Sequence, residues 1–231
     1  MISIDVIIPI YKEQENLREV ITKLNHQVKA NLHFFICYDF DEEPGLNLLP
    51  NIKNITKVKN IGRSPSEAIL TGINNSNSEF ILVYMADDFE NINLINTFIR
   101  LSNKYDLIIP SRYVKDGKFK NAKFIKKFIA VLGYVLLNKI LRIPYKDCTN
   151  AFKFFRRNII NDIKFESKAG FTYAMELTIK CNFLKKRIIE IPCTWRDLEN
   201  RVSNFKIVKW LPYYLYWAFR AFIYQARNFL K

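Results

Sequence analysis

The 231-residue sequence is poor in the residues on which several common catalytic sites depend. It contains six glycines, and neither a G-x-G-x-x-G nor a G-x-x-x-x-G-K-[ST] segment occurs. These absences remove the main sequence support for a dinucleotide-binding Rossmann site and for a P-loop. Only two histidines, His26 and His33, are present, which argues against a His-based catalytic triad and a metal site with several histidines. We interpret both as surface or packing residues.

Cysteines and long apolar runs are also scarce. The four cysteines lie far apart and form no C-x-x-C pair, so the pattern predicts neither a zinc ribbon nor a disulfide framework and favours a reduced, intracellular protein. The longest apolar runs, 128–137 and 210–219, are about half the ~20 residues that span a bilayer. The first residues show no basic region or cleavage site typical of a signal peptide. We therefore expect a cytoplasmic protein without a membrane-spanning segment.

Hydrophobic residues make up 49% of the chain, enough for a buried core, and the net charge is +14. The charge is uneven, because residues 1–115 hold 12 basic and 14 acidic side chains whereas residues 116–231 hold 24 and 8. The first half is therefore suited to binding a cation, and the second attracts anions such as phosphates, nucleic acid or a membrane surface.

The spacing of apolar residues in the first half predicts strands that alternate with helices. Strands are expected at 4–8, 32–38, 55–58, 80–85 and 107–109, and helices at 13–27, 65–74 and 94–103. Ser64, Pro65 and Glu67 form a capping-box pattern that marks the start of the second helix. This order predicts an α/β fold with a mostly parallel sheet and helices on both faces, with ligands at the carboxyl ends of the strands. We expect one domain over residues 1–231.

The second half has longer amphipathic segments. Residues 118–141 and 205–230 have helical spacing that places lysines and arginines beside aromatic and aliphatic residues, and shorter elements are expected at 151–155 (strand), 173–181 (helix) and 187–191 (strand). Aromatic helices with basic flanks are typical of the boundary between water and lipid. The alternative is that these helices complete the core or form a dimer interface.

Acidic residues follow two of the predicted strands. Asp87, Asp88 and Glu90 come directly after the strand at 80–85, and Asp39 follows the strand at 32–38. Carboxylates at this edge of a sheet are suited to Mg²⁺ or Mn²⁺, which commonly share their oxygen ligands with substrate phosphates. The alternatives are an acidic turn that caps the following helix, and a solvated loop.

Several segments together resemble family 2 glycosyltransferases of the GT-A fold. The similar segments, in the same order, are VIIPIYKEQENL, YDFDEEPG, NIGRSPSEAILTGI, FILVYMADDFE, PSRYVKDG, DCTNAFKFFRR, FTYAMELTIK and IIEIPCTWRD. They span nearly the whole chain, and the second half is most similar to the branch typified by dolichol-phosphate mannosyltransferase. The resemblance implies a nucleotide-sugar-binding half at 1–115 and a basic half facing acceptor and membrane at 116–231.

The resemblance also implies roles for individual residues on the donor side. Base and ribose of the nucleotide sugar would be bound by Pro9, Tyr11, Glu13 and Asp39, with Arg63 near them and Asp87 and Asp88 at the diphosphate. The metal motif of the family, Asp-x-Asp with a further oxygen ligand two residues later, maps onto Ala86, Asp88 and Glu90. Because the first Asp is replaced by Ala86, the implied ligands of Mg²⁺ or Mn²⁺ are Asp88, Glu90 and Asp87.

On the acceptor side, the resemblance implies catalytic roles for Arg112, Asp147 and Glu176 beside Asp88. Acceptor phosphate would be bound by Arg112, Lys153, Arg196 and Arg201. After TWRD the family usually has Arg and then Gly-x-Ser-Lys, where this chain has Leu198, Arg201 and Asn204 in place of the Arg, Gly and Lys. Arg196 or Arg201 compensates for the missing cations, or the acceptor differs.

The expected function is metal-dependent, inverting transfer of a sugar from a GDP- or UDP-sugar to a polyprenyl phosphate, by a protein bound peripherally at the cytoplasmic face of a membrane. A polyprenyl phosphate is already anionic and needs no general base. Three alternatives stay open: transfer to a sugar hydroxyl in surface glycan synthesis, with Asp147 or Glu176 as base; a degenerate nucleotide- or membrane-binding homologue; and, on charge alone, a nucleic-acid binder, which the absence of a nucleic-acid motif disfavours. Sequence leaves the oligomeric state open.

Overall fold

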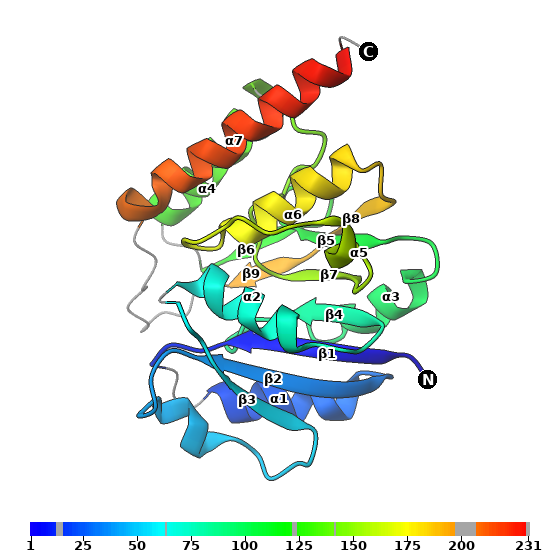
Figure 1. The fold of residues 1–231 in the computed structure, drawn as a ribbon, viewed down its shortest axis with the longest axis vertical. Coiled ribbons are helices and arrows are strands. Elements are labelled where there is room, and N and C mark those ends of the chain that lie inside the picture. The colour runs from blue at the N-terminus through cyan, green and yellow to red at the C-terminus, as the bar shows by residue number, and fades with distance from the viewer. Residues whose placement is uncertain (13–15, 63, 122–123, 141, 197–206, 230–231) are drawn as a thin grey trace.

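The computed structural model describes residues 1–231 apart from 13–15, 63, 122–123, 141, 197–206 and 230–231. Its centre is a seven-stranded sheet in the order β3-β2-β1-β4-β7-β5-β8 (Figure 1). Every neighbouring pair is parallel except those that β7 makes with β4 and β5. This confirms the predicted α/β class with a mostly parallel sheet. The strands are β1 (Ser3–Pro9), β2 (Asn31–Tyr38), β3 (Ile55–Lys59), β4 (Phe80–Val83), β5 (Leu107–Ser111), β7 (Lys153–Arg156) and β8 (Ile188–Pro192).

Helices cover both faces of this sheet, as predicted. On one face α1 (Asn16–Gln27) and α3 (Leu94–Leu101) pack against the strands, and on the other α2 (Pro65–Asn75), α5 (Ile159–Asp162) and α6 (Thr172–Phe183) do so. Helix α1 buries Leu17, Val20, Ile21 and Leu24, a spacing that places all four on one side of a helix. The short 3₁₀ helix η1 (Pro44–Leu48) follows β2 and was not predicted.

The predicted start of α2 is confirmed. The Ser64 hydroxyl accepts a hydrogen bond from the backbone N–H of Glu67 at 3.2 Å, and Pro65 occupies the first helical turn. A proline costs nothing there, because that backbone nitrogen has no partner within the helix. Helix α2 thus begins at Pro65, shortly after β3 ends at Lys59.

An outer layer lies over α6 (Figure 1). It consists of α4 (Phe124–Tyr134), the π-helical turn η2 (Val135–Ile140) and the long helix α7 (Ile207–Phe229). Trp217, Ala218 and Ala221 of α7 are buried against Met175 and Ile179 of α6. Within the described part of the chain, none of the helices combines the length and the apolar character needed to cross a bilayer.

A two-stranded parallel ribbon corrects the prediction for the second half. Residues 118–120, predicted as the start of a helix, form β6 (Lys118–Lys120), which pairs with β9 (Thr194–Arg196). The turn that precedes β6 is closed by a bond from Gly117 N–H to the Val114 carbonyl, and the N–H of Lys118 donates to the Cys193 carbonyl. This pairing joins segments more than 70 residues apart, and helical spacing along one segment cannot indicate it.

The parallel strands bring their carboxyl ends to one edge of the sheet. β1, β2, β4, β5 and β8 all end there, so the loops that follow them are neighbours. The acidic loop follows β4, which ends at Val83 rather than at residue 85, and Arg112 follows β5. The topology therefore places most of the predicted site residues along one edge.

Candidate active site

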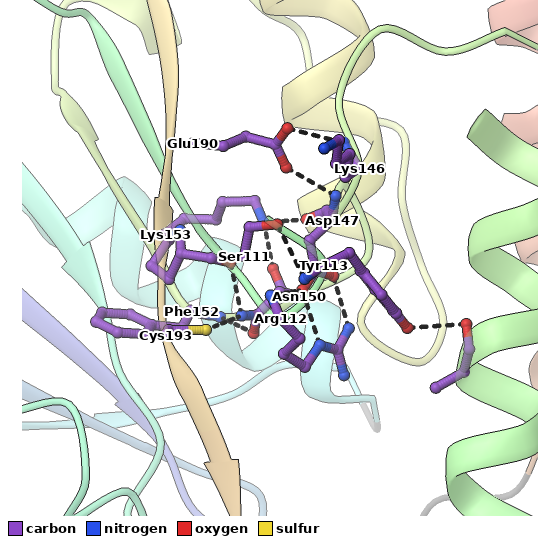
Figure 2. Close-up of polar contacts among 12 residues, drawn as sticks. Ser111, Arg112, Tyr113, Lys146, Asp147, Asn150, Phe152, Lys153, Glu190 and Cys193 are labelled. Carbon is purple, nitrogen blue, oxygen red and sulfur yellow. Dashed lines mark hydrogen bonds and ion pairs between the residues drawn. The ribbon is translucent and has the colours of Figure 1, made fainter. Parts of the chain in front are cut away.

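An ion pair between Arg112 and Asp147 lies at the end of β5 (Figure 2). The backbone N–H and the Nε of Arg112 donate to Asp147 Oδ2, both at 2.8 Å, and Nη2 donates to Oδ1 at 2.6 Å. The Asp147 side chain is 0% exposed and that of Arg112 is 13% exposed. Burial opposes the charged guanidinium, but the Asp147 carboxylate holds the pKa of Arg112 above its ordinary value. The result is a cation that is fixed in place and retains a small exposed fraction.

Glu190 of β8 fixes the loop that carries Asp147, and sequence reasoning missed this residue. Its two carboxylate oxygens accept the backbone N–H groups of Lys146 and Asp147, each at 2.9 Å (Figure 2). Both acceptor oxygens thus hold the loop in place, and Asp147 in turn holds Arg112. The available signal was an acidic residue inside the apolar strand IIEIP. An acid in such a position requires hydrogen-bond partners.

Lys153 lies beneath this loop and points into the protein. It is fully buried on β7, and its Nζ donates to the carbonyls of Asp147, at 3.4 Å, and Asn150. Burial, opposed by the Asp147 charge, lowers the pKa of Lys153 to about 8. Lys153 therefore supports the loop from below, and direct contact with an acceptor phosphate stays a prediction.

The acidic loop after β4 is organised by Asp88. Its Oδ1 accepts the backbone N–H groups of Glu90 and Asn91, at 3.1 and 3.2 Å, and the Asn91 Nδ2 donates to Oδ1 and Oδ2 at 2.9 and 2.8 Å. Burial raises the pKa of Asp88 to about 6 although these hydrogen bonds lower it. The carboxylate thus shapes the turn but does not cap the following helix, as one alternative had expected, because α3 begins only at Leu94.

Asn91 also ties this loop to the ribbon. Its Nδ2 donates to the Thr194 carbonyl at 2.8 Å, and its Oδ1 accepts the Thr194 N–H at 3.0 Å. On the same ribbon, Phe119 of β6 lies 5.6 Å from the Arg112 guanidinium and contacts the ring of Trp195. The ribbon therefore connects the acidic loop to the Arg112–Asp147 pair.

Glu90 pairs with two cations on the ribbon. Its Oε2 accepts from Lys120 at 2.7 Å, and its Oε1 lies 2.5 Å from Arg196. The hydrogen bond from Lys120 is the main cause that lowers the pKa of Glu90, and burial opposes it. The structure thus places Arg196 beside Glu90. Contact of Arg196 with an acceptor phosphate stays a prediction.

The candidate metal ligands differ in how far they are committed to other partners. Among the described residues, no group of three or more His, Cys, Asp or Glu side chains is arranged to hold a metal ion. Ala86 is buried and has no side-chain oxygen, and Glu90 is engaged by two cations. Asp88 Oδ2 accepts one of the hydrogen bonds described above whereas Oδ1 accepts three, so Oδ2 is the oxygen of this carboxylate that better fits a cation shared with substrate phosphates.

The residues predicted for the nucleotide lie on the other side of the same edge. Pro9 ends β1, and the half-exposed ring of Tyr11 meets Phe40 edge to face at 5.9 Å between centroids. Asp39 Oδ1 accepts from Asn60 Nδ2 at 2.8 Å, which holds the loops after β2 and β3 together. Their contact with base and ribose stays a prediction. Glu13, Arg63 and Arg201 lie outside the described residues.

Glu176 is buried and bonded to groups near it on α6 and on the preceding loop. Its side chain is 0% exposed on α6, where the two oxygens accept the backbone N–H groups of Glu166 and Ser167 at 2.7 and 2.8 Å. Lys180 also donates to Oε1 at 2.6 Å. The carboxylate thus holds the loop before α6, and its bonds are to Glu166, Ser167 and Lys180 rather than to the Arg112–Asp147 pair. Its catalytic role stays a prediction.

Comparison with known proteins gives a family match and several relatives. Residues 5–164 match the family described as Glycosyl transferase family 2. The chain is 29% identical over 206 residues to a dolichol-phosphate mannosyltransferase from Pyrococcus furiosus, which covers 84% of this chain and 56% of that protein. It is 28% identical over 96 residues to an undecaprenyl-phosphate mannosyltransferase from Micrococcus luteus, with 41% and 40% covered. The chain therefore spans about half the length of these two relatives.

A third relative is covered more fully, and solved structures share the fold. A polyprenol monophosphomannose synthase from Mycolicibacterium smegmatis is 22% identical over 230 residues, with 89% of this chain and 85% of that protein covered. Glucosyl-3-phosphoglycerate synthase from Mycobacterium tuberculosis with uridine diphosphate matches at a TM-score of 0.65 and 12% identity, over 96% and 80% of the two chains. The same enzyme with Mn²⁺, uridine diphosphate and product matches at 0.65 and 11% identity, over 95% and 78%.

Proposed function

The chain belongs to glycosyl transferase family 2 and has the GT-A fold, and from this premise we propose that it transfers a sugar, with inversion, from a nucleoside-diphosphate sugar to a polyprenyl phosphate at a membrane surface. That it is a glycosyltransferase follows from the family. The donor, the acceptor, the metal and the membrane are parts of the proposal. The three curated relatives described above, which are named for dolichol phosphate, undecaprenyl phosphate and polyprenol, support the acceptor class.

One observation carries the choice of acceptor. A sugar hydroxyl must lose a proton as it attacks, so its transferase needs a carboxylate within reach. Asp147 and Glu176 are the candidates, and both side chains are 0% exposed, with their oxygens bound to Arg112 and to backbone N–H groups and Lys180. A phosphate acceptor is already anionic near pH 7 and needs only a cation to position it. Arg112 is such a cation, fixed in place and partly exposed.

Asp88 and Asp87 would hold a divalent cation together with the diphosphate of the donor. Mg²⁺ and Mn²⁺ typically bind through one or two carboxylates plus substrate phosphates, so a complete protein cage is not required. When bound, such an ion offsets the charge that develops on the leaving diphosphate. Asn91 keeps the Asp88 carboxylate in one orientation, and the Arg112–Asp147 pair fixes the opposite side, so in-line attack depends on positioning.

The exposed faces of α4 and α7 support binding to a membrane surface. Large apolar side chains are at least one-third exposed along both helices: Phe128, Val131 and Leu132 on α4, and Leu211, Tyr213, Leu215, Tyr216, Phe219 and Phe222 on α7. Helices that combine such faces with lysine and arginine bind at the lipid headgroup boundary. A peripheral transferase would reach a lipid-linked phosphate in this way.

The test is nucleotide-sugar turnover by the purified protein. A panel of GDP- and UDP-sugars is supplied with Mn²⁺ or Mg²⁺, and the acceptor is a short polyprenyl phosphate, a free sugar or none. The expected result is metal-dependent release of one nucleotide that rises with the lipid and falls at least about tenfold in Asp88→Asn. Asp162→Asn, which changes an exposed acid paired with Lys186, is the control for loss of a surface charge. Turnover with a sugar acceptor but not with the lipid, or nucleotide binding with no turnover, would contradict the proposal.

A further inference from the structure

Two cations on neighbouring strands meet at one carboxylate. Lys120 of β6 and Arg196 of β9 are direct partners in the register of the ribbon, and they contact the two different oxygens of Glu90. One carboxylate neutralises only one of these two cations. Exposed ion pairs contribute little to stability, which gives no stability reason for two cations to share this acid.

The cluster lies where phosphates are expected. Glu90 follows Asp88 by two residues, and its backbone N–H donates to Asp88 Oδ1 at 3.1 Å. The ribbon strand that carries Arg196 is bound to the same loop through Asn91 and Thr194. Lys120 and Arg196 are therefore held beside the acids at the carboxyl edge of the sheet. This is the edge at which ligands bind in open α/β sheets.

The acidic loop would repel a bound diphosphate. Asp87, Asp88 and Glu90 all stand on one loop, and a nucleoside diphosphate would add further negative charge beside them. Lys120 and Arg196 offset this repulsion. Their side chains are 44% and 46% exposed, whereas Glu90 is only 19% exposed. Glu90 thus anchors the two cations from beneath, and their outer sides face solvent.

We propose that Lys120 and Arg196, positioned by Glu90, bind the diphosphate of the nucleotide-sugar donor. The inference rests on the proposed function and adds Lys120 to its phosphate-binding residues. It assigns Arg196 to the donor rather than the acceptor, and it makes Glu90 a positioning residue rather than a metal ligand. The two cations stay with the nucleoside diphosphate as it leaves, and charge-assisted hydrogen bonds from Arg and Lys to phosphate are among the stronger polar contacts in proteins.

The test measures binding instead of turnover, so that it does not depend on a metal. Affinities of GDP, UDP and their monophosphates are measured by calorimetry in EDTA for the wild type, Lys120→Gln and Arg196→Gln. Binding of the wild type to the diphosphates with Mn²⁺, and of all three proteins to vesicles that contain polyprenyl phosphate, is measured alongside. Lys118→Gln is the matched control, because Lys118 is an exposed lysine on the same strand, whereas the ion pairs of Glu90 are with Lys120 and Arg196. Circular dichroism verifies that every variant is folded.

In each of the two variants, the affinity for the preferred nucleoside diphosphate is expected to fall about tenfold. The affinity for the monophosphate should fall less than about threefold, and Lys118→Gln should bind both nucleotides as the wild type does. Wild-type affinity in both variants would overturn the inference. So would weaker binding to vesicles that contain polyprenyl phosphate together with unchanged diphosphate binding, because the cations would then serve the acceptor. If the wild type turns over the donor while the variants bind it normally, only this inference fails. If the wild type binds neither diphosphate even with Mn²⁺, the proposed function fails with it.

Discussion

The amide of Asn91 donates to both carboxylate oxygens of Asp88, at 2.9 and 2.8 Å, and so fixes the orientation of the acid at the centre of the candidate site. The same amide makes two hydrogen bonds with the backbone of Thr194 on β9. One buried side chain thereby sets both the direction of the carboxylate and the position of the ribbon. The orientation of Asp88 depends on a contact 103 residues away in sequence.

Asn91→Ala tests this connection. The substitution leaves the Thr194 N–H and part of the Asp88 carboxylate without their partner, so we expect the free energy of unfolding to fall by about 2 kcal/mol. Nucleotide-sugar turnover should fall at least about tenfold, because Asp88 loses its fixed orientation. Urea unfolding and steady-state kinetics measure the two effects. Asn93→Ala is the control, since the Asn93 side chain makes no capping hydrogen bond at the start of α3. Equal stability of the two variants would count against a stabilising role for the bonds of Asn91 with Asp88 and Thr194.

Arg112→Lys tests the cation at the end of β5. A lysine keeps the charge but cannot reproduce the two-pronged contact that Nε and Nη2 make with Asp147. We expect kcat/KM for the polyprenyl phosphate to fall at least about tenfold while the KM of the nucleotide sugar stays within about twofold. Arg100→Lys is the control, because it makes the same change on the surface of α3. A defect in donor KM alone would place Arg112 on the donor side.

Lys153→Met tests the buried lysine through the pH dependence of stability. The pKa of Lys153 is about 8 in the folded protein, against 10.5 as its ordinary value. Between these two values the unfolded chain binds a proton that the folded chain has lost, so this residue makes the free energy of unfolding rise with pH. The full difference is on the order of 3 kcal/mol.

Urea unfolding of the wild type and Lys153→Met at about pH 7 and about pH 10 measures this difference. Other titrating groups affect both proteins equally, so the wild type should gain stability relative to the variant as the pH rises. Lys57→Met, at an exposed position of β3, controls for the loss of a lysine. A constant difference between wild type and variant would show that Lys153 keeps its proton over this range.

Phe219→Ser with Phe222→Ser tests the apolar face of α7. The two rings are 61% and 52% exposed, and burial of each in a lipid interface is worth about 2 kcal/mol. We expect the affinity for anionic liposomes at low salt, measured by sedimentation, to fall at least about tenfold. The stability of the double variant in urea should be unchanged. Leu184→Ser changes an exposed apolar residue outside both α4 and α7 and is the control. Equal liposome binding of wild type and double variant would contradict docking through α7.

The sequence by itself determined the α/β class, most element positions and the edge on which the site lies, because these depend on local rules. Short apolar runs between helical segments predicted β1, β2 and β4, and the Ser64–Pro65–Glu67 pattern marked the start of α2. The family was also readable from ordered motifs along the chain, and the match over residues 5–164 agrees with it.

Only the tertiary structure decided which site residues contact one another. The ribbon of β6 and β9, the support of Asp147 by Glu190 and the pairing of Glu90 with Lys120 and Arg196 all join distant segments. The same holds for the burial of Lys153 and Glu176, which sequence motifs placed with the exposed site residues. A motif states which side chain follows a strand, whereas its partners and its solvent exposure depend on how the whole chain packs, and these decide whether a charged group meets a ligand or another part of the protein.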